Sequence, residues 1–328
     1  MKKRILTGLQ PTGVITLGNY IGAIKQMVKY QDEYESFIFV ADLHALTIPK
    51  DPDELRKNIR SLIALYIACG IDPEKNTIFI QSENIYHANL GFILECQTPY
   101  GQLGRMTQFK DKSKKGENFS AGLFTYPVLM ASDILLYDID YVPVGEDQTQ
   151  HVELTRDIAD IVNKRYGNVF KLPEALIPSE GAKILDLVDP SKKMSKSAEN
   201  KKGVIGLLDD LNLIRKKIMG ATTDSEMKIK YDPDNKPGIS NLITIYSSLA
   251  NVPIKDIEEK YKDSNYGTFK SDVADIVVGV IEKIQNRYNE LINSEKLDTI
   301  LDNGRDITSK LAKEKLDLVK EKLGIKRK

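Results

Sequence analysis

The sequence predicts an α/β fold, in which a parallel sheet covered by helices is followed by a region of helices alone. The first 190 residues alternate short apolar runs with amphipathic stretches, which is the pattern of β-α units in a parallel sheet. After Pro190 the strand-like runs stop, and helical periodicity dominates from Leu207 to the end. The chain has 328 residues, 41% of them apolar and 29% charged, which is enough for one large domain or two ordinary ones.

The first predicted unit is a strand, a glycine-containing loop, a helix and a second strand. Residues 5–7 form the short first strand, and the loop after it contains Gly8, Pro11 and Gly13. The apolar side chains of the helix recur on one face, at Leu17, Ile21, Ile24 and Val28. Residues 37–41 are apolar throughout, as expected of a strand that is covered on both sides.

The second predicted helix has sequence signals at both ends. Residues 51–54, Asp-Pro-Asp-Glu, supply an N-cap, a first-turn proline and an acidic third residue, a combination worth about 1 kcal/mol. Gly70 ends the helix, and its inward side chains are Leu62, Leu65 and Cys69.

Two more strands are predicted before the helical region. Residues 77–80 form one and residues 141–144 the other, whose Pro143 indicates an irregular position in the sheet. Farther along, residues 231–238 form a break marked by proline and glycine. The helical periodicity of this second region is carried by Leu211, Ile214, Ile218, Val273, Ile276, Val277, Val280 and Ile281.

Charge and cysteine content exclude several classes of protein. Lysine plus arginine equals aspartate plus glutamate, at 47 each, so a nucleic-acid partner would be held by local basic patches. Cys69 and Cys96 lie in apolar contexts without a CxxC spacing and are expected to be reduced core residues of a cytoplasmic protein. The three histidines are scattered, which argues against a zinc site. No apolar run is long enough to span a membrane, and no signal peptide is evident.

The stretch SKKMSKSAEN, residues 191–200, gathers three lysines and three serines around Met194. A polar, charge-rich stretch after a proline is usually a solvated loop. It would have a further role if the fold placed a polyanion beside it.

Two loops at strand ends have the composition of ligand sites, because ligands of an open parallel sheet bind beyond the carboxyl ends of its strands. Residues 8–13 are followed by residues 16–19 at a helix start, where free N–H groups and the helix dipole favour an anion. Glycine-rich β-α turns without a ligand are common too. Residues 145–148, Gly-Glu-Asp-Gln, suit the hydroxyls of a ribose, although an N-cap with dipole-matched charge explains them as well.

A buried acid is the third signal. Asp133 lies in a largely apolar helical stretch, on the same face as Met130 and Tyr126. An unpaired buried carboxylate is costly, so it needs a hydrogen-bond donor. An intramolecular partner would satisfy it, and so would the N–H or O–H group of an aromatic ligand.

Together these segments resemble the class I aminoacyl-tRNA synthetases, through KMSKS at residues 193–197, TLGN at 16–19 and VPVGEDQTQH at 142–151. TGLQPTGVITLGNYIGA, RMTQFKDKS and DILLYDIDYVPVGEDQ are similar to the bacterial tryptophanyl branch, and the resemblance covers essentially the whole chain. The class signature His-x-Gly-His is replaced by Thr16 and Asn19, both able to donate hydrogen bonds to phosphate. Leu6 stands where some relatives have an aromatic residue in the pocket wall.

The resemblance implies a fold, a reaction and partners. Residues 1–190 would form a Rossmann-like catalytic domain, residues 191–204 the KMSKS loop, and residues 205–292 a helical domain that binds the tRNA anticodon. Residues 293–328 would pack back on the catalytic domain. The expected reaction, in a homodimer, is activation of L-tryptophan by ATP to tryptophanyl-adenylate and transfer to the 3′ end of tRNA(Trp). Mg²⁺ would arrive with ATP as substrate, and no prosthetic group or separate metal site is expected.

The resemblance also implies residues for the nucleotide. Lys112, Lys193 and Lys196 would be the catalytic lysines that meet the triphosphate. The ATP-binding residues would be Gln10, Pro11, Thr12, Gly18, Asn19, Gly145, Glu146, Asp147, Ile184, Lys193, Met194, Ser195, Lys196 and Ser197.

For the amino acid, the resemblance implies that Asp133 accepts the indole N–H and that Tyr126 and Gln148 meet the α-amino group. The side chains that line the ring would be Met130, Val142 and Val144, with His44 nearby. His87 and His151 are expected to be structural.

Three other functions fit parts of the pattern. A tyrosyl-tRNA synthetase shares the fold and the loop, and Asp133 could equally accept a phenolic O–H. A small-molecule nucleotidyltransferase could share the nucleotide site, but such enzymes usually lack a long helical region with a basic tail like residues 305–328, which hold nine basic and four acidic residues. A non-catalytic RNA-binding homologue is disfavoured because the three lysines, Gly18 and Asp133 are all present.

Overall fold

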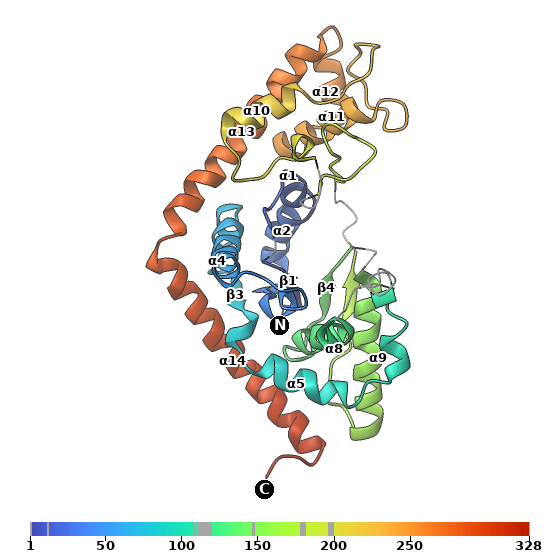
Figure 1. The fold of residues 1–328 in the computed structure, drawn as a ribbon, viewed down its shortest axis with the longest axis vertical. Coiled ribbons are helices and arrows are strands. Elements are labelled where there is room, and N and C mark those ends of the chain that lie inside the picture. Colours follow the sequence, from blue (N-terminus) through green and yellow to red (C-terminus); the bar gives the residue numbers. More distant parts are fainter. Residues whose placement is uncertain are drawn as a thin grey trace.

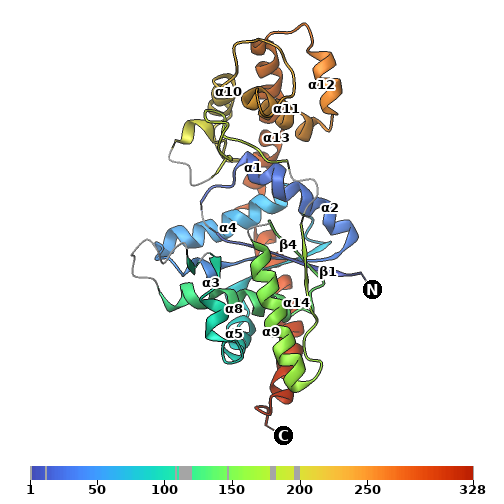
Figure 2. The same cartoon turned by 90° about the vertical axis from the view of Figure 1, so that its right-hand side faces the viewer.

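The computed structural model describes residues 2–11, 13–107, 109–110, 120–145, 148–177, 182–195 and 200–327. Within them a five-stranded parallel sheet has the strand order β3-β2-β1-β4-β5, with helices on both faces and a separate group of helices beyond one end (Figures 1 and 2). This arrangement confirms the predicted fold class, a Rossmann-like sheet followed by a helical region.

Three strands of the sheet have five or six residues each, and the other two have only three. β1 (Arg4–Leu9), β2 (Glu35–Val40) and β3 (Asn76–Ile80) pair in register along their lengths. β4 (Tyr141–Pro143) pairs with β1 only between Ile5 and Tyr141, so Pro143 lies where no ladder bond to β1 is needed. The predicted irregularity is therefore confirmed. β5 (Glu174–Leu176) is an edge strand that the sequence did not predict, because it is short and mostly exposed.

One face of the sheet carries the first helices of the chain. The predicted helix after β1 is present but begins as α1 (Leu17–Asn19), continues as a π-helical turn, η1 (Tyr20–Ile24), and ends as α2 (Lys25–Glu33). α4 (Pro52–Ala68) begins as predicted, because the Asp51 carboxylate accepts hydrogen bonds from the backbone N–H groups of Asp53 and Glu54. The short α3 (Asp42–Ala45) follows β2.

The other face is covered by helices that are mostly later in the sequence. They are α5 (Tyr86–Glu95), α6 (Tyr100–Leu103), α8 (Ala121–Leu135), α9 (Thr149–Tyr166) and α14 (Glu295–Lys322). Their inner sides bury the large aromatic residues Phe37, Phe79 and Tyr137. Cys69 is buried as predicted, but the prediction for Cys96 is wrong: it lies exposed beyond the last buried turn of α5.

The remaining helices are α10 (Leu211–Met219), α11 (Pro237–Ala250), α12 (Ile254–Lys260) and α13 (Tyr266–Leu291). α13 runs from this group back toward α4, and α14 then passes along the sheet (Figure 1). Gly304 lets α14 approach β3 closely, because a Cβ there would lie 1.8 Å from the carbonyl oxygen of Ile78.

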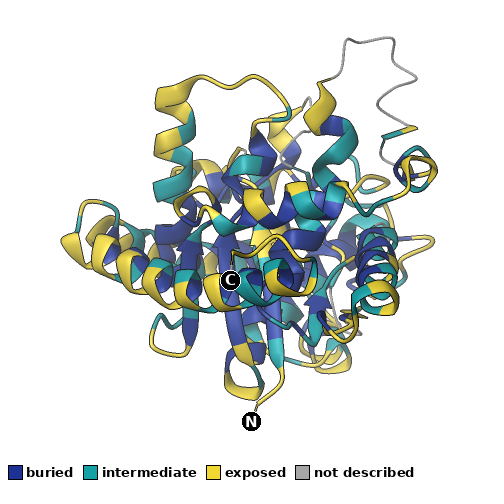
Figure 3. Cartoon of the chain, turned by 90° about the horizontal axis from the view of Figure 1, so that it is seen from below, coloured by how far each residue is buried: buried dark blue, intermediate teal, exposed yellow. Residues whose placement is uncertain are grey.

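Seen from below, the strands are buried and the helices around them expose their outer sides (Figure 3). Every described helix is too short or too polar to span a membrane.

Candidate active site

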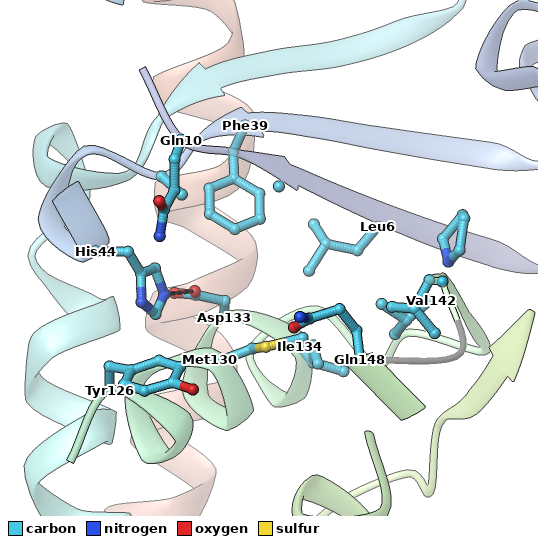
Figure 4. A pocket seen from close by; sticks show the side chains of 15 residues that line it. Leu6, Gln10, Phe39, His44, Tyr126, Met130, Asp133, Ile134, Val142 and Gln148 are labelled. Carbon is cyan, nitrogen blue, oxygen red and sulfur yellow. Dashed lines mark hydrogen bonds and ion pairs between the residues drawn. The ribbon is translucent and has the colours of Figure 1, made fainter. Parts of the chain in front are cut away.

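A cavity of about 440 Å³ lies at the carboxyl ends of β1 and β4, against the inner face of α8 (Figure 4). This volume falls within the roughly 300–1,000 Å³ range of small-molecule sites. Its lining residues are Leu6, Gly8, Gln10, Phe39, Ala41, His44, Tyr126, Met130, Asp133, Ile134, Val142, Pro143, Val144, Gly145 and Gln148. The cavity therefore lies where a parallel sheet is expected to bind its ligand.

One wall of the cavity is apolar and flat. Leu6 and the ring of Phe39 lie side by side on it, with Val142 of the neighbouring strand next to Leu6 and Met130 of α8 opposite (Figure 4). Gly8 makes room for the Phe39 ring, because a Cβ at this position would lie 2.5 Å from the ring carbon Cζ. Leu6 thus fills its part of the wall with an aliphatic side chain, and Phe39 supplies an aromatic one beside it.

The inner end of the cavity is formed by the Asp133 carboxylate, which is 1% exposed. Oδ2 lies 2.8 Å from Nε2 of His44. Oδ1 lies 2.7 Å from Nδ1 of His87 and accepts a hydrogen bond of 2.8 Å from Nε2 of Gln81. Burial alone would raise the pKa of Asp133, but the hydrogen bonds from the two histidines outweigh it and hold the pKa below its usual value. Because a carboxylate oxygen can accept two hydrogen bonds, Oδ2 has capacity for a donor from the cavity.

A second layer of buried groups lies behind Asp133. Nε2 of His87 is 2.7 Å from the hydroxyl of Tyr137, which also accepts a 3.0 Å hydrogen bond from Nδ2 of Asn84. All three side chains are buried, and burial raises the pKa of Tyr137 well above its usual value. His87 therefore does more than fill the core, since it links the carboxylate in the cavity to a neutral phenol.

Tyr126 lies two turns before Asp133 on α8, and Gln148 lies at the start of α9; both face the cavity (Figure 4). The Tyr126 hydroxyl is 2.7 Å from Nε2 of His151, a buried residue in the first turn of α9. Burial raises the pKa of Tyr126 to about 12, so the hydroxyl keeps its proton at neutral pH. His44 meets the Tyr126 ring edge-on, with centroids 6.3 Å apart.

The TLGN segment forms a capping box at the start of α1. The Thr16 hydroxyl accepts a hydrogen bond from the Asn19 backbone N–H, and the Asn19 side-chain oxygen accepts from both the N–H and the hydroxyl of Thr16. These bonds use the hydroxyl proton of Thr16, so the expectation that it also donates to phosphate does not agree with this geometry. The Asn19 NH₂ group takes no part in them and can donate.

The same segment is bound to the chain that follows the KMSKS loop. The backbone N–H of Leu17 donates to the carbonyl of Ile205, and that of Leu207 donates to the carbonyl of Ile15, each at 2.9 Å. Gly18 packs on Met194, since a Cβ there would lie 3.4 Å from Cβ of Met194. Met194 is buried, and its N–H donates to the carbonyl of Ile184. The two predicted phosphate-binding segments are therefore neighbours.

The family described as "tRNA synthetases class I (W and Y)" matches residues 1–282. The tryptophan–tRNA ligase of Bacillus subtilis is 54% identical over 328 residues, which cover all of this chain and 99% of the relative.

The chain belongs to the class I tRNA synthetases of this tryptophan and tyrosine family.

Solved structures of such synthetases have the same fold. The tryptophanyl-tRNA synthetase of Mycoplasma pneumoniae has a TM-score of 0.88 and 36% identity and covers 99% of both chains. That of Campylobacter jejuni, "complexed with ADP and Tryptophane", has a TM-score of 0.86 and 38% identity and covers 98% of this chain and 99% of its own. The predicted family and its tryptophanyl branch are therefore confirmed.

The structure of this synthetase brings the residues expected to bind the amino acid into one cavity, whose lining includes Asp133, Tyr126, Met130, Gln148, Val142, Val144 and His44. Of the nucleotide residues, Gln10 and Gly145 line the same cavity, whereas Gly18 and Ile184 both contact Met194 and are not among the lining residues. Pro11 lines a smaller cavity with Gly13 and Asp51. The backbones of Lys193 and Leu185 pair in an antiparallel manner, and Ser195 lies two residues farther along the chain. The other expected residues, Thr12, Lys112, Glu146, Asp147, Lys196 and Ser197, lie outside the described part of the chain.

Three site residues were missed by the sequence analysis. Phe39 lies in a continuous apolar strand, in which no alternation marks the side that faces the cavity. His87 and His151 lie 46 and 25 residues from their partners Asp133 and Tyr126. No local spacing rule connects such pairs, so only the fold brings them together.

Proposed function

We propose that the chain is a tryptophan–tRNA ligase that works in two steps. In the first, a carboxylate oxygen of L-tryptophan attacks the α-phosphorus of ATP, forming tryptophanyl-adenylate and releasing pyrophosphate. In the second, the tryptophanyl group passes from the adenylate to a hydroxyl at the 3′ end of tRNA(Trp), and AMP leaves. Neither step needs a protein nucleophile, because positioning and charge stabilisation suffice for this chemistry.

The observation that supports tryptophan as the substrate is the Asp133 carboxylate at the inner end of a cavity with apolar walls. It is ionised, it is held by three donors from the protein, and Oδ2 has capacity for one more donor. The indole N–H is a donor without an acceptor function, so it matches this end of the cavity. The ring then lies between Phe39 and Met130, and Tyr126 with Gln148 meets the α-amino group.

ATP occupies the strand-end side of the same site. Gln10, Pro11, Gly18 and Asn19 cradle the nucleotide and its phosphates, together with Thr12. Gly145, with Glu146 and Asp147, holds the ribose, and Ile184 packs near the adenine. Lys193, with Lys112 and Lys196, meets the triphosphate, where each charge-assisted contact is worth roughly 1.5–3 kcal/mol. Met194, Ser195 and Ser197 belong to the same loop, and Mg²⁺ accompanies ATP as part of the substrate.

The chain is divided into a catalytic part and a part that binds tRNA. Residues 1–190 are the catalytic domain, and residues 191–204 are the KMSKS loop. Residues 205–292 are the anticodon-binding domain, and residues 293–328 pack back on the catalytic domain. The support is that β1, β4 and α8 line the cavity, whereas α10–α13 lie at the far end of the molecule (Figure 1). The enzyme acts in the cytoplasm.

The working form is a homodimer. Leu46, Ile85 and Phe92, here called the α5 surface, are large apolar side chains that are 61%, 71% and 68% exposed. Leu46 and Phe92 border a groove of about 510 Å³ whose inner wall includes His44 and Tyr126. A second copy on the α5 surface would therefore cover apolar area directly behind the amino-acid site.

ATP–pyrophosphate exchange with a panel of amino acids tests the function. Only tryptophan should stimulate exchange. Asp133→Asn should raise the KM for tryptophan about tenfold to a hundredfold, because a neutral amide replaces the charged acceptor of the indole N–H. Asp138→Asn is the matched control, since Asp138 pairs with Lys315 outside the cavity. Exchange stimulated only by tyrosine would overturn the assignment.

A further inference from the structure

His151 is a buried histidine for which the proposed mechanism has no role. It lies in the first turn of α9 and is 1% exposed. Its Nε2 atom is 2.7 Å from the hydroxyl oxygen of Tyr126 on α8, and the two rings lie 5.5 Å apart at an interplanar angle of 41°. Tyr126 in turn lines the cavity. His151 therefore contacts the amino-acid site through the Tyr126 hydroxyl group.

The direction of this hydrogen bond decides what Tyr126 can bind. An ammonium group has three N–H donors and no acceptor, whereas a hydroxyl has one proton and two lone pairs. Tyr126 can accept from an ammonium group without conflict only if its own proton points to another acceptor. The protonated state of the hydroxyl is secure, because burial raises the pKa of Tyr126 to about 12.

We infer that His151 is a positioning residue: its Nε2 lone pair accepts the hydroxyl proton of Tyr126 and leaves the phenolic oxygen as an acceptor for the α-ammonium group of the amino acid. The inference rests on the proposed function and adds a specificity element to it. The site should therefore bind indole ligands whose side chain carries a cationic amine more tightly than indole carboxylic acids that lack this amine.

The opposite polarity has the opposite consequence. If Nε2 carried a proton and donated to Tyr126, the phenolic proton would point into the cavity and favour an acceptor such as a carboxylate oxygen. Ligands that differ only in the amine and the carboxylate therefore report the direction of the bond.

The test measures dissociation constants by calorimetry for L-tryptophan, tryptamine and indole-3-propionate on the full chain. His151→Leu should weaken binding of tryptophan and tryptamine about tenfold to a hundredfold and leave indole-3-propionate within about twofold. Tyr126→Phe should give the same pattern, and the double variant should add nothing further. His151→Gln, whose amide oxygen can accept the proton, should restore most of the lost affinity.

Equal loss for all three ligands, or a loss confined to indole-3-propionate, would overturn the inference. If His151→Leu does not fold, as shown by its thermal unfolding, Tyr126→Phe and His151→Gln still carry the comparison. Failure of the proposed function is a separate result, because it would appear as wild-type protein without tryptophan-dependent pyrophosphate exchange.

Discussion

At the scale of single residues, the site is organised by hydrogen bonds that lie behind its ligand-facing atoms. Asp133 faces the cavity, but its three donors come from α3, the turn after β3, and α5, through His44, Gln81 and His87. A buried carboxylate with several donors is stable as an anion and fixed in orientation. The hydroxyl of Tyr137 extends this arrangement one step further into the core.

Tyr137→Phe should destabilise the protein by about 1–3 kcal/mol, because it removes the partner of His87 Nε2 and of Asn84 Nδ2 from a buried place. The KM for tryptophan should rise only a few-fold, because every direct contact of Asp133 remains. Urea unfolding and pyrophosphate exchange measure the two effects. Tyr100→Phe, on an exposed tyrosine, is the control, and unchanged stability of Tyr137→Phe would show that the phenol is not a required partner.

The sequence predicted most of the residues that line the cavity, but it missed Phe39 and the two histidines behind the lining. Asp133, Met130 and Tyr126 share a helix face by simple periodicity, so their common placement could be predicted. His87 and His151 belong to other helices, and their contacts depend on how α5 and α9 pack against α8. Packing of this kind is not encoded in any local pattern.

At the scale of elements, the first helix has local features at the place where we propose that the nucleotide binds. Its capping box fixes the Asn19 side chain, its π-helical turn follows immediately, and its first residues pair with residues 205–207. The helix itself was predictable from its apolar face. The π turn was not, because it spans only residues 20–24, too few to change the apolar periodicity of the whole helix.

Thr16→Val should cost about 1 kcal/mol of stability, since valine cannot accept the capping hydrogen bond of the Asn19 N–H. It also releases the Asn19 side-chain oxygen from the hydroxyl, so the KM for ATP should rise about threefold to tenfold. Thr16→Ser keeps the hydroxyl and should resemble wild type in both thermal unfolding and ATP kinetics. A serine variant as impaired as the valine variant would assign the effect to lost packing instead.

At the scale of the whole molecule, two apolar cores lie on the two sides of the sheet. One continues from α2 and α4 into α10–α13, and the other joins α5, α8 and α9. α14 belongs to both, with Leu297 and Leu301 in the first and Ala312, Leu316 and Val319 in the second. Its path depends on the close approach at Gly304, which could not be inferred from the helical periodicity of residues 295–322.

Phe92→Glu on the α5 surface should convert the proposed dimer into a monomer, because it would bury a carboxylate at an apolar interface. Size-exclusion chromatography with light scattering gives the mass directly. Ile307→Glu is the matched control, since Ile307 is an exposed apolar residue on α14, away from the α5 surface. A dimer that persists in Phe92→Glu would place the α5 surface outside the subunit contact, and a monomeric wild type would overturn the proposed dimer.

The cavity that we propose binds an indole ring belongs to a chain without tryptophan. The chain has 15 tyrosines and no tryptophan, and Tyr126 forms part of the cavity wall. A bound tryptophan is thus the sole long-wavelength emitter in the molecule, and light absorbed by the neighbouring tyrosines passes to it by energy transfer. Binding of tryptophan to the unaltered protein can therefore be followed by fluorescence without a label.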